Sequence, residues 1–329
     1  MEIEISKDMI NKRADVLVLE YLRKNGYRLI SRSTLRKFWD KIVSVEGKII
    51  KPSLKLKEDN SINVNLEKLD EEIREDIERL SILPQKGELD VIFEDKDCLV
   101  INKRSGVVVH PGVANPVNTL ANYVVDYLSR KGEYNSSLKR GGIVHRLDKG
   151  VSGLILFAKQ PESQIFFQKQ FQDHKVNKVY LAKVEYSKMN ENLFGLLGSE
   201  KKSVKEVLDS LEKNSFVCDT GWLRLEGYIH RSLLNRIKMR FDSTKKDSTS
   251  KYSLSYIKPL SENELLIKIE TGRMHQIRAS LEYLGINIVG DTLYSTKSGK
   301  GGVPDSIELE SVLLSLPNLE NKIMTFRLK

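Results

Sequence analysis

A charged tetrad, His145-Arg146-Leu147-Asp148, lies between paired glycines and the uninterrupted apolar run Gly153–Ala158. An apolar run of this length is typical of a buried strand, so the tetrad is expected at the rim of a hydrophobic core. Holding Arg146 and Asp148 there costs desolvation energy unless the charges are paired. The tetrad is therefore either a structural turn, in which Asp148 accepts backbone hydrogen bonds, or part of a functional site.

Two further stretches carry side chains suited to chemistry. In residues 270–278 a strand is expected to end before a helix, and His275 and Arg278 share one face of that helix. In residues 178–183 the side chains alternate as in a strand, and Tyr180 lies among them. Surface arginines on a capped helix and a tyrosine packed in a core are the plainer interpretations of the same residues.

The chain after residue 84 mixes short strand patterns with helical ones. Strands are expected at Leu89–Phe93, Cys98–Asn102, Gly153–Ala158, Val179–Val184 and Leu265–Thr271. Helices are expected from Thr119 to Gly132, from Glu162 to about Gln172 with Ile165, Phe166 and Phe167 inward, and from about Met274 to Leu284. Because strands and helices do not alternate one for one, we predict an α+β fold with a mixed, largely antiparallel sheet. Residues 187–227 show helical and loop character without a motif.

The distribution of charge divides the chain. Residues 1–66 contain 14 Lys/Arg and 9 Asp/Glu, a net charge of +5, whereas residues 67–80 contain 7 acidic and 3 basic residues, a net charge of −4. A basic module is thus followed by an acidic connector, with Pro84 and Gly87 after it. We predict a small α/β domain at residues 1–66, a linker at residues 67–84 and a larger domain at residues 85–329.

The basic module contains a predicted helix that begins near residue 31. Its buried face is expected at Leu35, Phe38, Trp39 and Ile42. Arg32 and Arg36, one turn apart, lie on another face with Lys37 beside them, and a hairpin over residues 43–49 carries Lys48. These cations form either a solvated surface or a nucleic-acid contact.

Composition restricts the partners and the chemistry. The net charge of +9 favours polyanions such as nucleic acid, although a merely basic soluble protein has the same charge. The chain lacks GxGxxG, P-loop, HExxH and GxSxG motifs, and its five histidines lack metal-ligand spacing. Cys98 and Cys218 form no CxxC pair, which suits a reducing cytoplasm, and no apolar run approaches the ~20 residues of a membrane span.

Taken together, these stretches resemble the RluA family of pseudouridine synthases over nearly the whole chain. The family signature HRLDxxTSG is matched at His145–Gly153, with Gly150 in place of the usual Asp and Val151 in place of the usual Thr. The signature TGRxHQIR is complete at Thr271–Arg278, and Asp291 and Tyr294 match as well. The family's late Leu-His-Ala stretch is replaced by residues 310–315, which leaves the last strand open.

The basic module resembles the S4 RNA-binding domain. The matching stretches are Ser31–Lys37, Val45–Lys48 and Lys51–Lys57. The resemblance implies that the helix and the hairpin hold RNA phosphates, through Arg32, Arg36, Lys37 and Lys48.

The resemblance implies the isomerisation of uridine to pseudouridine in RNA, without a cofactor or a metal ion. Asp148 would be the catalytic carboxylate and Arg278 its ion-pair partner. Tyr180 would stack on the uracil and could remove the C5 proton in the last step, and Arg146 would fill the position that the flipped base vacates. Further RNA contacts are expected from His145, Arg273 and His275.

The stretches Phe93–Lys103 and Val107–Gly112 look like the branch of the family that carries an S4 domain. Members of that branch modify large-subunit ribosomal RNA, which implies 23S ribosomal RNA or a pre-ribosomal particle as the partner of a cytoplasmic monomer. Two alternatives stay open. The departures at Gly150 and Val151 would suit an assembly factor that binds RNA without catalysis, and a synthase acting on transfer RNA would share the same motifs.

Overall fold

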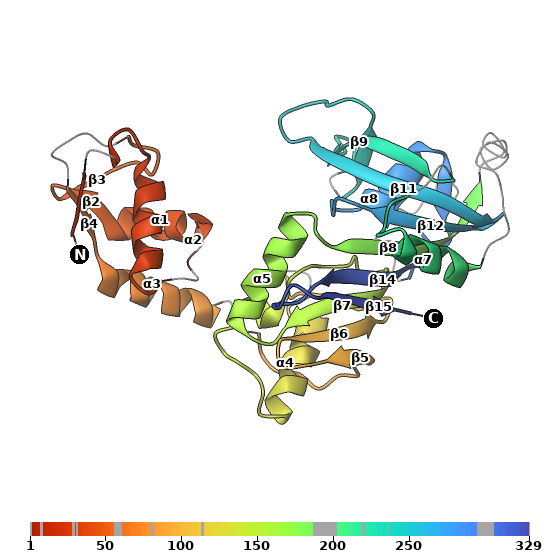
Figure 1. Ribbon diagram of the computed structural model, residues 1–329, viewed down its shortest axis with the longest axis horizontal. Coiled ribbons are helices and arrows are strands. Elements are labelled where there is room, and N and C mark those ends of the chain that lie inside the picture. The colour runs from red at the N-terminus through yellow and green to blue at the C-terminus, as the bar shows by residue number, and fades with distance from the viewer. Residues whose placement is uncertain are drawn as a thin grey trace. The chain divides into compact units, whose positions relative to one another are not determined.

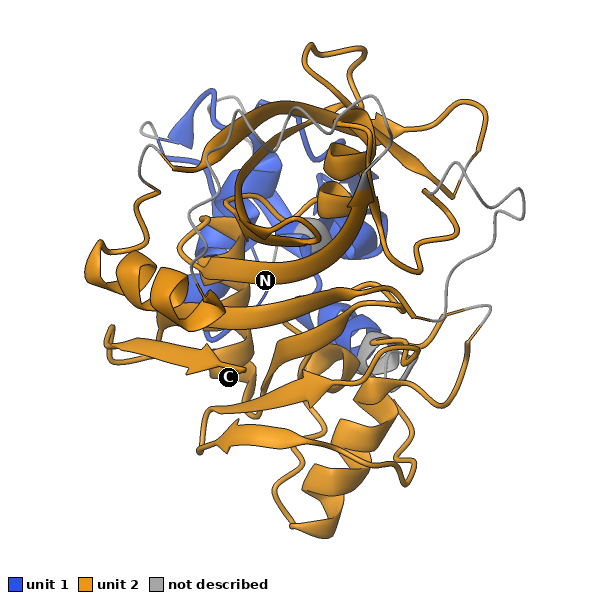
Figure 2. Ribbon diagram, turned by 90° about the vertical axis from the view of Figure 1, so that its right-hand side faces the viewer, with its two compact units in different colours: residues 1–81 blue, residues 82–329 orange. Residues whose placement is uncertain are grey.

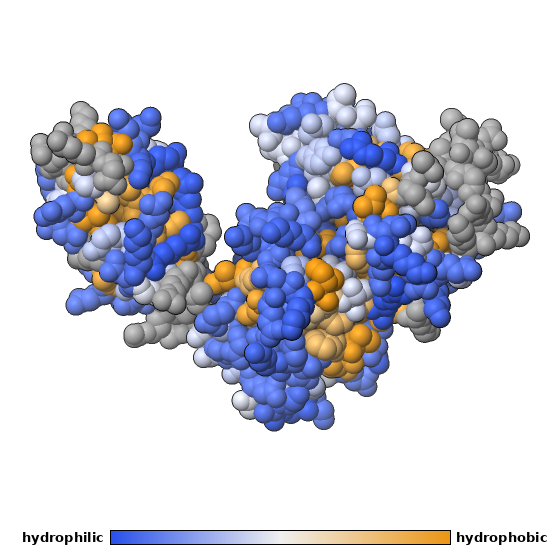
Figure 3. Space-filling model, in the orientation of Figure 1, coloured by the Kyte–Doolittle hydropathy of each residue, from blue (hydrophilic) through white to orange (hydrophobic). Residues whose placement is uncertain are grey.

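The chain forms two compact units, residues 1–81 and 82–329, each with its own hydrophobic core (Figures 1 and 2). The computed structural model describes the chain except residues 1, 7–8, 28–29, 31, 56–60, 80–81, 113–114, 187–202, 219–220, 236, 295–305 and 329. The segment 187–202, for which only helical and loop character was expected, lies outside the described residues. The visible surface is mainly hydrophilic, with apolar side chains in separate patches (Figure 3).

Unit 1 packs three helices against a four-stranded antiparallel sheet of order β1-β4-β2-β3. Its elements are β1 (Glu2–Glu4), α1 (Ala14–Lys24), α2 (Arg32–Ile42), β2 (Val43–Val45), β3 (Lys48–Ile49), β4 (Ser61–Val64) and α3 (Leu66–Arg79). The predicted buried face of α2 lies in the core of this unit, and Trp39 is fully buried. The acidic stretch that follows residue 66 is helical, and its Leu69 is buried in the same core.

One buried carboxylate joins α1 to α2. The Asp15 side chain is 0% exposed and accepts hydrogen bonds from Arg13 (3.1 Å), Arg32 (3.0 and 3.1 Å) and Arg36 (2.8 and 2.5 Å). Burial alone would raise the pKa of Asp15. The three guanidinium groups lower it by more than burial raises it, so the pKa falls well below the usual range. Arg32 and Arg36 are therefore part of the fold of unit 1, although each side chain keeps more than 40% of its surface exposed.

Unit 2 is built on one large mixed sheet of order β10-β9-β11-β12-β8-β14-β7-β6-β5. Its strands are β5 (Val91–Glu94), β6 (Cys98–Lys103), β7 (Ser152–Ala158), β8 (Asn177–Tyr186), β9 (Leu223–Arg231), β10 (Met239–Asp242), β11 (Lys251–Ser261), β12 (Glu264–Ile269), β13 (Ile286–Ile288), β14 (Leu309–Pro317) and β15 (Ile323–Arg327). Its helices are α4 (Leu120–Arg130), α5 (Pro161–Gln172), α7 (Val204–Lys213) and α8 (Gln276–Tyr283). Among the described strand pairs only β7 with β14 is parallel, which confirms the predicted α+β fold.

The alternation of side chains along the strands decides which helix covers which face. In β6, Leu99 and Ile101 share a core cluster with α4, whereas Cys98 and Val100 share another with Phe167 of α5. The same rule in β8 directs Val179 toward α7 and Tyr180 toward the opposite face. The sheet is thus covered on both faces, and each face packs its own hydrophobic clusters against helices.

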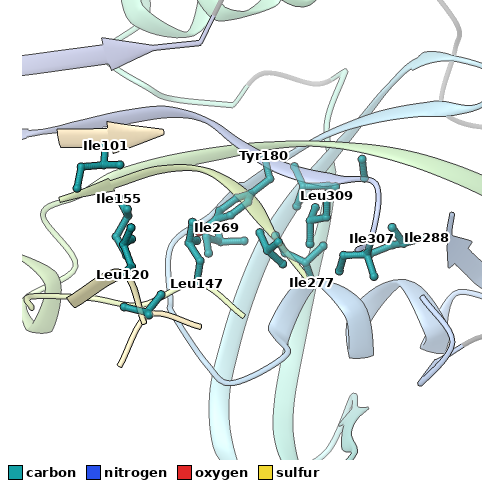
Figure 4. Close-up of a cluster of buried hydrophobic side chains, with 14 of the residues drawn as sticks. Ile101, Leu120, Leu147, Ile155, Tyr180, Ile269, Ile277, Ile288, Ile307 and Leu309 are labelled. Atoms are coloured by element: carbon teal, nitrogen blue, oxygen red, sulfur yellow. The ribbon is translucent and has the colours of Figure 1, made fainter. Parts of the chain in front are cut away.

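The core cluster on the α4 face holds the residues that precede the candidate catalytic side chains. Leu147 and Ile277 are each 6% exposed, and both lie in one cluster with Tyr180 (Figure 4). Asp148 and Arg278 follow them directly in the chain. Burying one residue of each pair therefore fixes the backbone from which its charged neighbour projects.

Three details differ from the expectations. Residues 310–315 form the centre of β14, so the last strands are present although the family's Leu-His-Ala stretch is not. Residues 223–227, expected as helix or loop, begin the long strand β9. Ile165, expected to face inward, is 41% exposed, because α5 places only Phe167 fully in the core.

We predict that Asp15→Asn destabilises unit 1 by about 1.5–3 kcal/mol, since it weakens hydrogen bonds made to a charged group. Because the pKa of Asp15 is depressed on folding, the wild-type contribution is present above about pH 4 and is lost as the pH falls below it. Hydrogen exchange of the α1 and α2 amides measures the effect in the whole chain. Asp40→Asn, an exposed position on α2, is the control, and equal exchange in both variants would contradict the prediction.

Candidate active site

A cavity of about 430 Å³ in unit 2 gathers the residues that the sequence motifs single out. Its walls come from residues 144–151 before β7, residues 171–180 from α5 into β8, and residues 269–278 from β12 into α8, with Leu309 of β14. The lining includes the four residues predicted to act on the uridine, Arg146, Asp148, Tyr180 and Arg278, and three predicted to contact RNA, His145, Arg273 and His275. Arg32, Arg36, Lys37 and Lys48 belong to unit 1 and line no part of this cavity.

Arg278 joins two carboxylates. Its Nε and Nη2 donate to Asp291 at 2.7 and 2.8 Å, and its Nη1 donates to Oδ2 of Asp148 at 3.3 Å. The arginine and Asp291 are almost completely buried, whereas Asp148 keeps 21% of its side chain exposed. Burial opposes the charge on Arg278, but Asp291 and Asp148 raise its pKa, so it stays protonated. The predicted pairing with Asp148 is therefore single-pronged, and the two-pronged pairing is with Asp291.

The second oxygen of Asp148 is left open. Arg278 and His275 both approach Oδ2, and Oδ1 has no hydrogen-bond partner among the residues that the structure describes. Because Asp148 lines the cavity, a carboxylate oxygen without a donor is free to meet a substrate atom there. The geometry therefore suits Asp148 to act at the substrate through Oδ1 while Oδ2 is held.

The turn between β12 and α8 is fixed by buried amide and hydroxyl groups. Gln276 accepts hydrogen bonds from the Thr271 hydroxyl (2.7 Å) and the Arg273 amide (3.0 Å), and its side-chain nitrogen donates to Leu254 and Ser255. Thr271 and Gln276 are each 3% exposed. These two residues of the second motif therefore hold the turn, which leaves Arg273, His275 and Arg278 to face the cavity.

His275 lies at the N-cap of α8 rather than inside the helix. It adopts the left-handed conformation (φ 54°), which turns its ring toward the cavity. Its Nε2 lies 3.7 Å from Oδ2 of Asp148, and its Nδ1 lies 3.0 Å from the Tyr294 hydroxyl. Its side chain is only 9% exposed. His275 is therefore part of the carboxylate site and not a surface RNA contact alone.

Tyr180 is buried beside the carboxylate. Burial raises its pKa far above the ordinary value, and the negative charge of Asp148 raises it further. With so high a pKa the phenol stays protonated at neutral pH, so its phenolate is scarcely available as a base. Its ring, which lines the cavity, is better suited to contact a base.

Three further cations line the cavity. Arg146 is exposed and makes no hydrogen bond or ion pair with any described residue, so its guanidinium is available to a ligand. Arg273 is anchored by donating from Nε to the Tyr252 carbonyl at 2.8 Å. Lys178 is 6% exposed, and burial lowers its pKa to about 8. The sequence pattern did not single out Lys178, although it lies two residues before Tyr180 and thus on the same face of β8.

His145 and Lys103 support the loop that carries Asp148. His145 stacks on Phe171 with ring centroids 4.3 Å apart, and its Nε2 accepts the Leu156 amide hydrogen bond at 2.9 Å. Burial lowers its pKa to about 3, so the ring is neutral, and its contact with RNA stays a prediction. Lys103 is fully buried and donates to three carbonyl groups, one of them that of Lys149 in the loop.

Comparison with known proteins agrees with this architecture. Residues 97–283 match the family described as RNA pseudouridylate synthase. The chain belongs to this family. It is therefore an enzyme of the isomerase class.

Similar proteins in this family include relatives named ribosomal large subunit pseudouridine synthase D. The protein from Borreliella burgdorferi is 30% identical over 87% of this chain and 78% of its own length. The protein from Zymomonas mobilis is 31% identical over 64% of this chain and 57% of its own length. Human RNA pseudouridylate synthase domain containing 1 shares the fold, with a TM-score of 0.52 at 20% identity over 74% of this chain and 86% of its own.

The described residues contain no cluster of three or more histidine, cysteine, aspartate or glutamate side chains able to hold a metal ion. None of the helices in the described ranges has both the length and the apolar character needed to span a membrane.

We predict that Arg278→Lys lowers kcat by at least about tenfold, although the positive charge is kept. An ammonium group cannot span Asp148 and Asp291 as the planar guanidinium does, and each lost hydrogen bond to a charged group costs about 1.5–3 kcal/mol. Single-turnover rates of pseudouridine formation measure the effect. Arg130→Lys, at an exposed pair with Asp126 on α4, is the matched control, and equal rates in both variants would contradict the bridging role.

Proposed function

We propose that this chain converts specific uridines of large-subunit ribosomal RNA to pseudouridine, with Asp148 as the catalytic carboxylate and without a cofactor. The observation that supports this best is the convergence of Asp148, Tyr180 and Arg278 on one cavity from three distant segments. The Borreliella and Zymomonas relatives, both named ribosomal large subunit pseudouridine synthase D, support the choice of RNA. We place the enzyme in the cytoplasm as a monomer.

The reaction breaks the bond between C1′ and N1 of uridine, turns the base and rejoins it through C5. Nothing is consumed or released, so the chemistry needs only groups that bind, orient and move protons. Asp148 acts through its open Oδ1, either as a nucleophile at C1′ or as a base at the sugar. Arg278 pairs with the carboxylate and fixes its direction through Oδ2.

The target base must leave the RNA stack to reach a buried carboxylate, which costs a few kcal/mol. The exposed guanidinium of Arg146, two residues before Asp148, fills the space that the base vacates. Tyr180 contacts the uracil through its ring, since its raised pKa disfavours a role as the base that removes the C5 proton. The cationic groups of Arg273 and Lys178 face the adjoining phosphates or the base.

Unit 1 acts as an RNA-binding domain of the S4 type. Its exposed cations include Lys37 on α2 and Lys48 on β3, and Arg32 and Arg36 combine phosphate contact with the support of Asp15. Mapping pseudouridines by chemical labelling in a strain that lacks the protein tests the substrate directly. Loss of sites in transfer RNA alone would redirect the assignment, and loss of no site would favour an assembly factor without catalysis.

We predict that Asp148→Asn abolishes pseudouridine formation while affinity for RNA falls by less than about tenfold, or 1.4 kcal/mol. Asparagine keeps the size of the side chain but removes its charge and its nucleophilic oxygen. Chemical labelling of the product and equilibrium titration of RNA measure the two effects. Asp126→Asn on α4 is the control, and residual turnover near wild type would falsify the assignment.

We predict that Lys37→Ala with Lys48→Ala weakens RNA binding and makes its salt dependence shallower, by roughly 0.7–0.9 in log–log slope per lost phosphate contact. These lysines are chosen instead of Arg32 and Arg36, because replacing those arginines would also remove two hydrogen-bond donors of the buried Asp15. Titrations at several salt concentrations measure the slope. The exposed Lys12 and Lys24, changed together, are the control, and an unchanged slope would end the S4-type assignment of this surface.

A further inference from the structure

Tyr294 determines which nitrogen of His275 carries the hydrogen. The Tyr294 hydroxyl accepts from the Met239 amide at 2.8 Å, donates to the Met239 carbonyl at 3.1 Å and lies 3.0 Å from Nδ1 of His275. A phenol has one hydrogen and accepts two hydrogen bonds. All three contacts are satisfied together only when Nδ1 of His275 carries a hydrogen and donates it to the hydroxyl.

With its hydrogen on Nδ1, the neutral form of His275 has a lone pair on Nε2. Burial lowers the pKa of His275, Arg278 and Arg146 lower it as well, and the carboxylates of Asp148 and Asp291 raise it, with a net decrease. The neutral form therefore predominates at neutral pH. Its free Nε2 is an acceptor that faces the carboxylate oxygen of Asp148 across 3.7 Å.

Two acceptors that face each other need a donor between them. At 3.7 Å the two atoms are beyond hydrogen-bond distance, and neither supplies a hydrogen in this tautomer. Arg278 already directs Nη1 at the same carboxylate oxygen and the rest of its guanidinium at Asp291. The missing donor must therefore come from solvent or from the substrate.

The substrate has a suitable donor in this place. When Asp148 acts at C1′ or at the neighbouring carbon, the 2′-hydroxyl is the ribose hydroxyl nearest to the carboxylate. It can donate to Nε2 of His275 while its oxygen accepts from a guanidinium hydrogen. The 2′-hydroxyl is also the group by which proteins distinguish RNA from DNA at a given position.

We propose that His275, oriented by Tyr294, accepts a hydrogen bond from the 2′-hydroxyl of the target uridine and thereby selects ribose over deoxyribose. The inference rests on the proposed function and assigns a specificity-determining contact within that site. It makes Tyr294 a positioning residue, which acts only through His275.

The experiment compares two synthetic fragments of the ribosomal RNA that the enzyme converts. They differ only in a uridine or a 2′-deoxyuridine at the mapped target. Single-turnover rates with each fragment give a preference for ribose, and the ratio of preferences between two enzymes cancels the intrinsic chemical difference of the sugars. The enzymes are the full-length wild type, His275→Asn, His275→Gln and Tyr294→Phe. The control is His230→Gln, which alters a histidine paired with Asp242 outside the cavity.

We expect His275→Asn to lower the preference by roughly three- to tenfold, the range of one neutral hydrogen bond, because its amide can reach Tyr294 but not the sugar. His275→Gln, which extends an acceptor to the position of Nε2, should recover part of the preference, and Tyr294→Phe should lose part of it. His230→Gln should keep the wild-type preference.

Equal losses with both fragments in His275→Asn would show a purely structural role and overturn the inference, while the proposed function would stand. Failure of the wild type to convert either fragment would overturn the proposed function and the inference with it. If His275→Asn does not fold, the preferences of His275→Gln and Tyr294→Phe decide, and wild-type values in both would again overturn the inference.

Discussion

The salt bridge that Arg278 makes with two carboxylates is the interaction on which the site depends. A buried guanidinium needs compensation, and Asp291 supplies it with a two-pronged contact, while Asp148 receives a single hydrogen bond from Nη1. Asp148 is consequently oriented without being fully neutralised. If Asp148 had to compensate Arg278 alone, both of its oxygens would be occupied, and none would be left for a substrate.

The core beneath the site explains why such a bridge can form. Leu147 and Ile277 enter one apolar cluster, and the charged residues that follow them are brought together at its rim. Tyr180 reaches the same rim because the alternation along β8 directs it away from α7. Hydrophobic packing thus pays for the desolvation of a charged cluster that could not assemble by itself.

The sequence predicted the α+β fold and seven of the residues that line the cavity, because both depend on local patterns and on contiguous motifs. It did not predict that Asp291 takes the two-pronged contact of Arg278, or that Tyr294 orients His275. Those contacts join positions 13 and 19 residues apart in the chain, with the end of α8 and the strand β13 between them. Such a spacing in the sequence does not predict that the side chains meet. Asp15 escaped notice for the same reason, since an acidic residue on a helix is usually solvated.

The cations of the site are placed so that most of them are held by groups other than Asp148. Under the proposed function, the pocket needs cations for the RNA phosphates and an anionic Asp148 for the reaction, and additional cations close to Asp148 would weaken it as a nucleophile or a base. Arg278 is held by Asp291, Arg273 is anchored on Tyr252, and Lys178 lies with its pKa lowered to about 8 on the β8 side of the cavity. Among these four, Arg146 alone makes no hydrogen bond or ion pair with a described residue. The unanchored cation is therefore the one to which the proposed function assigns the space of the flipped base.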